Sequence, residues 1–196
     1  MNNATRESYE MSIDSDQFPD PAESTSKIPS VHYDLEVLIR QQKDREASLL
    51  AGQLLAEMLR ELLEKVLVDS VFQSPRKLFE PYGPLNSFGN LLSLSYAFGQ
   101  ISSTEYHSIL IIKRIQDLAE HSNEDSFSFT NSYVQKIIVG AMTTPSGTAT
   151  EIDEGVDSLA KSDPWLAFRV VFCNAQVKLL ARISAASQIS PAPDLD

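Results

Sequence analysis

The sequence is poor in the residues that carry redox and catalytic chemistry. Its 196 residues include one cysteine, Cys173, and three histidines. A single cysteine excludes an internal disulfide and a zinc ribbon, and its apolar neighbourhood predicts a buried, inert thiol. No serine–histidine–aspartate arrangement, phosphate-cradling glycine loop or Walker pattern occurs. The sequence therefore predicts a non-enzymatic protein with no catalytic residue, no cofactor and no metal site.

Long apolar runs and dense basic runs are also missing. No apolar run approaches the ~20 residues that a membrane span needs, and the N-terminus is polar, so we expect a cytoplasmic protein without membrane contacts. The formal net charge is −11. A strongly acidic surface repels phosphate backbones, and no candidate helix offers a row of exposed base-reading side chains. We expect no direct DNA binding.

The two ends of the chain have little to build a core with. Residues 1–30 hold six acids and two bases among Ser, Asn and Pro. Such a segment buries too little apolar area to offset the entropy of ordering, which predicts a disordered acidic tail. Residues 188–196 resemble a second short tail. One domain is expected between them, at residues 33–187.

Within this domain the periodicity is helical and strand signals are scarce, so the fold class is all-α, a single helical bundle. Ser87, Thr130 and Asp163 are candidate N-caps, and Ser102 with Glu105 fits a capping box. A loop is expected over 143–162. The last helix is apolar on several sides, which is typical of a central helix or a subunit interface, so we expect a homodimer. The expected helices cover 33–42, 45–68, 88–98, 103–120, 131–142 and 165–187.

One helix face gathers the polar side chains of most interest. Arg114, Asp117 and His121 lie at positions i, i+3 and i+7 of this helix. At 100° per residue, position i+7 returns to within about 20° of position i, so the three residues share one face. The plain interpretation is a histidine at a helix C-terminus, favoured by the macrodipole and hydrogen-bonded to a carboxylate. The alternative is nucleolytic. The Arg114–His121 spacing resembles the active helix of HEPN-type ribonucleases, in which arginine would hold the phosphate and histidine would transfer a proton without a metal.

A longer order of motifs resembles the mannitol operon repressor family. It covers roughly Leu35 to Ser187, and the chain departs from it at Gln116-Asp117, where many relatives carry Arg-Asn. The motifs that carry the resemblance are Gly83-Pro84-Leu85, Leu94-Ser95-Tyr96-Ala97-Phe98-Gly99, Ile101-Ser102, Glu105-Tyr106, His121 and Phe127-Ser128-Phe129.

The resemblance implies an all-helical transcriptional regulator that lacks a recognisable DNA-binding element. It would repress a mannitol or related sugar or polyol operon through contacts with a protein partner of a sugar-uptake or transcription system. The expected partner-binding surface comprises Gly83, Pro84, Leu85, Arg114, Asp117 and His121.

Overall fold

The computed structural model describes residues 34–67 (without 36 and 39), 76–123, 126–140 and 158–186. These residues are helical wherever secondary structure is regular, and none of them is in a strand, which confirms the all-α fold class. The expected tails at 1–30 and 188–196 and residues 143–157 of the expected loop lie outside this part of the chain. The helices are α2 (Asp44–Val66), α3 (Arg76–Phe79), α4 (Phe88–Ala97), α5 (Ser103–His121), α6 (Ser132–Gly140) and α8 (Pro164–Ala185).

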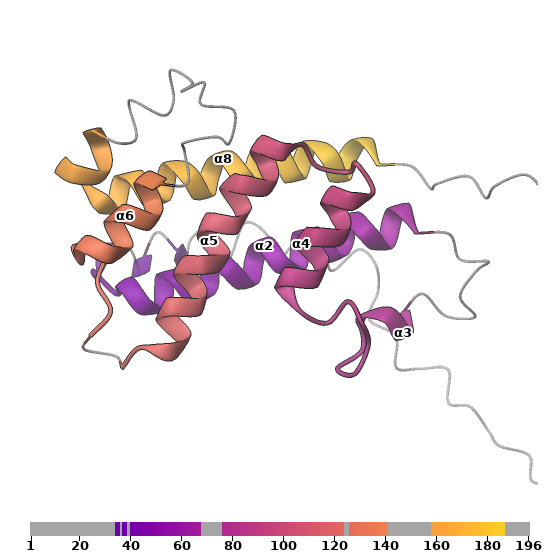
Figure 1. Ribbon diagram of the computed structural model, residues 1–196, viewed down its shortest axis with the longest axis horizontal. Helices are drawn as coiled ribbons and strands as arrows, with labels where there is room; N and C mark the ends of the chain where they lie inside the picture. The colour runs from indigo at the N-terminus through magenta and orange to yellow at the C-terminus, as the bar shows by residue number, and fades with distance from the viewer. Residues whose placement is uncertain are drawn as a thin grey trace, which may run out of the picture.

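Helix α2 runs along the bundle behind α4 and α5 (Figure 1). It packs against α4, α5 and α8, and α5 crosses it and contacts α6 and α8 as well. The apolar stripe of α2 is buried, whereas its outer face carries the ion pairs Arg60–Glu64 and Glu61–Lys65. An amphipathic helix of this kind is buried on one face only, as its periodicity predicts.

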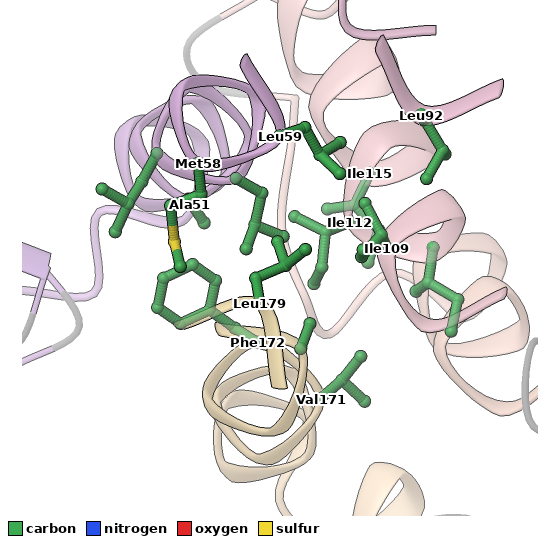
Figure 2. Close-up of a cluster of buried hydrophobic side chains, with 14 of the residues drawn as sticks. Ala51, Met58, Leu59, Leu92, Ile109, Ile112, Ile115, Val171, Phe172 and Leu179 are labelled. Carbon is green, nitrogen blue, oxygen red and sulfur yellow. The ribbon is translucent and has the colours of Figure 1, made fainter. Parts of the chain in front are cut away.

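The core between α2, α4, α5 and α8 is built from aliphatic side chains and phenylalanine (Figure 2). Its largest members are almost completely excluded from solvent. Helix α5 supplies the Ile109–Ile112 run, which therefore belongs to a buried helix and not to a strand. The residues labelled in Figure 2 are Ala51, Met58, Leu59, Leu92, Ile109, Ile112, Ile115, Val171, Phe172 and Leu179.

Three of the predicted N-caps are confirmed. Ser87 Oγ accepts from the Asn90 N–H at 3.3 Å, and Asp163 Oδ1 accepts from the Leu166 N–H at 3.0 Å. At the capping box, the Ser102 N–H donates to Glu105 Oε2 at 2.5 Å, and Ser102 Oγ accepts from the Glu105 N–H at 3.3 Å. These bonds satisfy N–H groups that have no partner within the helix.

Two predictions about local structure are wrong. The N-cap of α6 is Asn131 and not Thr130, because Asn131 Oδ1 accepts from the Tyr133 N–H at 2.9 Å. Residues 158–162, expected in a loop, are helical. Burial of Ala160 against the core stabilises this short segment despite its polar composition, and a helix of this length depends on such tertiary packing.

A close approach between α2 and α5 occurs at Gly52. A Cβ atom on this residue would overlap the side-chain amide of Gln116 on α5. The glycine therefore makes room for the neighbouring helix.

Glu105 joins the start of α5 to α8. Its carboxylate accepts hydrogen bonds from Arg182 Nε at 3.2 Å and Nη2 at 3.1 Å. Burial of Glu105 raises its pKa, but hydrogen bonds with Arg182 and Ser102 outweigh burial and hold the pKa below the usual glutamate value. The carboxylate is thus the ionised centre of a cap and an interhelical ion pair.

No helix among the described residues is long and apolar enough to span a lipid bilayer.

Candidate functional site

The turn between α3 and α4, residues 80–87, is held by its own backbone. The Gly83 N–H donates to the Glu80 carbonyl at 2.7 Å, and the Leu85 N–H donates to the Leu78 carbonyl at 2.8 Å. A Cβ atom on Gly83 would overlap the backbone of residues 77 and 78, so only glycine fits. The Leu85 side chain is buried in the core. Gly83 and Leu85 therefore shape and anchor the turn rather than face a partner.

Two asparagine side chains brace the same turn. The Asn86 side chain donates to the Pro81 carbonyl, and Asn90 Nδ2 donates to the Pro84 carbonyl at 2.7 Å. Above this brace Tyr82 is fully exposed. A large aromatic side chain in solvent on a fixed turn is unusual, and tyrosine is enriched where proteins bind one another. We did not single out Tyr82 from the sequence, although its place within Pro81-Tyr82-Gly83-Pro84 indicates a turn.

The middle of α5 lies next to the start of α4. A Cβ atom on Gly89 would lie 3.2 Å from Lys113 Cε, and Lys113 Nζ forms an ion pair with Asp117 Oδ2 at 2.5 Å. Arg114, the next residue of α5, is exposed. Lys113 thus connects the α4 end of the turn to the polar face of α5, a role that the sequence did not reveal.

His121 is held at the C-terminus of α5. Its Nδ1 lies 2.6 Å from the Asp117 carbonyl oxygen, which can only accept, so Nδ1 carries the proton and donates. We expected a carboxylate to accept the hydrogen bond from His121. That prediction is wrong, because the Asp117 carboxylate pairs with Lys113. Arg45 Nε of α2 donates to the nearby Ala119 carbonyl at 2.9 Å. This arrangement is the plain one, a histidine that satisfies a terminal carbonyl of its helix.

The structure brings the six predicted site residues together only in part. Pro84, Arg114 and His121 are exposed, whereas Leu85 is buried. His121 lies eight residues beyond Lys113, which is about 12 Å along the helix axis. The exposed residues therefore form an extended surface, and among the described residues no three metal-binding side chains gather at one point. We call this the α4–α5 surface: Tyr82, Pro84, Asn90, Lys113, Arg114, Asp117 and His121.

The sequence matches no family profile and no curated protein. In shape the chain is similar to MtlR in the X-ray structure of the MtlR–HPr complex from Escherichia coli. The TM-score is 0.48 at 19% sequence identity, and the match covers 79% of this chain and 99% of that chain. A likeness at this level carries no conclusion about activity or partner.

Proposed function

We propose that this protein is a cytoplasmic, non-enzymatic regulator of a mannitol or related sugar or polyol operon, and that it acts by binding another protein. The observation that carries the binding role is the α3–α4 turn, in which five hydrogen bonds fix the backbone while Tyr82 is exposed to solvent. A fixed turn loses little conformational entropy on binding, and a tyrosine supplies a large contact area.

The regulatory role and the class of operon come from the resemblance to the mannitol operon repressor family stated above. The net charge of −11 favours a protein partner over nucleic acid. Arg114 on α5 offers an exposed guanidinium, a group suited to carboxylate or phosphate on a partner. The expected domain at 33–187 would be the unit that carries both features.

The first test uses HPr, the protein bound to MtlR in the E. coli complex. Titration calorimetry should detect binding to the full chain, and Tyr82→Ala should weaken it by about 30-fold, the effect of one aromatic hot spot. Tyr133→Ala is the matched control, since Tyr133 is 61% exposed but belongs to α6. Equal binding by wild type and Tyr82→Ala would show that the turn is not the contact.

If HPr does not bind, capture from the native cytoplasm identifies the partner. The full chain and its Tyr133→Ala variant should retain the same protein, and Tyr82→Ala should lose it. Retention of nothing by wild type would contradict the binding role.

Incubation with RNA separates the regulator from the ribonuclease. Arg114 and His121 are two helical turns apart, about 10.5 Å along the axis of α5. We expect no cleavage by the purified protein. Robust cleavage that is lost in both Arg114→Ala and His121→Ala would replace the regulator with the enzyme.

A further inference from the structure

Helix α8 carries an apolar stripe on the face turned away from the core. Leu166, Val170 and Val177 are exposed, the last of them by 64%. Cys173 and Leu180, between and beyond them, are half-buried and pack in part against the core. At 100° per residue these five positions fall within about 40° of one line along the helix. The stripe is therefore one continuous surface and not a scatter of single exposed residues.

This stripe is distinct from the core face of the same helix. The core face points to the opposite side and is completely buried against α2, α5 and α6. The outer face of α2 carries charged residues in ion pairs, as a solvated helix face does. The stripe of α8 consists instead of uncharged apolar side chains, and a contiguous exposed apolar surface marks an interaction site. The residues of the core face are Ala167, Phe168, Val171, Phe172, Ala175, Gln176, Leu179 and Ile183.

We propose that a second copy of this chain covers the stripe, so that two α8 helices pack against each other about a two-fold axis near Cys173. The stripe reads Leu, Val, Cys, Val, Leu along the chain, and is nearly symmetric about its middle residue. A two-fold contact brings the same surface of both subunits together, so it requires a self-complementary patch of this kind.

The spacing of the stripe also fits a pair of helices. Its steps of four, three, four and three residues are those of a coiled-coil seam, with Val170 and Val177 at one core position and Leu166, Cys173 and Leu180 at the other. Apolar residues that repeat every 3.5 residues on average let two helices pack along a common seam.

Charge permits this contact as well. The chain has a net charge of −11, so two copies repel each other over most of their surface. Helix α8 contains Arg169, Lys178 and Arg182 but neither Asp nor Glu. The five residues of the stripe are uncharged and the three charged residues of the helix are basic, so two copies meet there without setting acid against acid.

The test measures the oligomeric state of the full chain. Light scattering at tens of micromolar should report a dimer. Val177→Glu places two like charges in the seam, and should raise the dimer dissociation constant by about a hundredfold or more. Because Val177 is in solvent in the single chain, this variant should keep the helical circular dichroism of wild type. Tyr133→Glu is the control, an equally exposed site on α6 that should stay dimeric.

Cross-linking locates the interface. Cys173 is the only cysteine in the sequence, and it is half-buried rather than fully buried as the sequence predicted. Because it lies in the middle of the seam, a short bis-maleimide should join two copies in wild type and Tyr133→Glu but not in Val177→Glu. A monomer at tens of micromolar would overturn the proposal. So would a dimer that survives Val177→Glu, or one that Cys173 does not cross-link. None of these outcomes depends on the partner proposed for the α4–α5 surface.

Discussion

The substitution Glu105→Gln tests the contact that fixes the start of α5. The wild-type carboxylate accepts from the Ser102 N–H and from two nitrogens of Arg182. Glutamine keeps one oxygen for the Ser102 N–H but turns its own NH₂ group toward the guanidinium. Both of these groups are hydrogen-bond donors, so no hydrogen bond forms between them. The variant should therefore fold with a weaker cap and without the ion pair.

The expected loss of unfolding free energy at pH 7 is about 2 kcal/mol. Weakening a capping interaction costs ~0.5–2 kcal/mol, and a hydrogen bond to a charged group contributes ~1.5–3 kcal/mol. For the Arg182 contact the lower end of the second range applies, because the Arg182 side chain is 45% exposed and can turn to water when its partner is neutral. The Glu105 side chain itself is only 7% exposed. Urea unfolding followed by circular dichroism measures the difference.

The pH dependence follows from the lowered pKa of Glu105. A carboxylate with a lower pKa in the folded than in the unfolded chain stabilises the fold fully above its unfolded pKa, near the ordinary value of 4.5. That stability is lost as the pH falls through the folded-state pKa. The gap between wild type and Glu105→Gln should therefore be constant from pH 7 to about 5 and shrink below about 4.5.

Glu61→Gln is the matched control on α2. Glu61 pairs with Lys65 at 3.2 Å, and both side chains are well exposed. Its loss should cost less than about 0.5 kcal/mol. If Glu105→Gln lowered the free energy of unfolding by as little as Glu61→Gln, the reasoning would be refuted. A loss that stayed the same between pH 7 and pH 4 would refute it as well.

Three further predictions have defined outcomes. Gly52→Ala should lower the free energy of unfolding in urea by about 1 kcal/mol, because Gln116 must turn away from the new methyl group. In a Gln116→Ala background the same substitution should stabilise the fold by about 1 kcal/mol through helix propensity, and additive effects would contradict the close approach. Asp44→Ala should cost about 2–3 kcal/mol, because Asp44 Oδ2 accepts from the buried Phe129 N–H at 2.8 Å, and thermal unfolding within 1 °C of wild type would exclude that role. A gel shift with the controlled promoter should show no specific band even at low salt, and a salt-sensitive shift competed only by operator would show a basic surface that the sequence does not reveal.

Much of the helical architecture could be predicted because its causes are local. Ser87, Ser102 with Glu105, and Asp163 each form hydrogen bonds within three residues of themselves. The apolar period of α2 needs no knowledge of its neighbours. The prediction failed where two adjacent residues could both cap a helix. Thr130 and Asn131 are both good N-caps, and only Asn131 occupies the position before α6.

The contacts that position the candidate surface could not be read in the same way. Arg45 with Ala119 and Asp44 with Phe129 join residues more than 70 positions apart, and nothing in their sequence neighbourhood pairs them. Tyr82 was missed for a related reason. An exposed aromatic and a buried one look alike in a sequence when the turn around them has no regular period.

These distant contacts bear on how the α4–α5 surface would bind. Helix α5 is tied to α8 through Glu105 at one end and to α2 through Arg45 at the other. The turn that carries Tyr82 is tied to α4 by Asn90. A partner would therefore meet side chains whose backbone is already placed, and little ordering would oppose binding. In such a rigid surface the loss of Tyr82 should speed dissociation and leave the association rate nearly unchanged, whereas loss of the exposed charge of Arg114 should slow association.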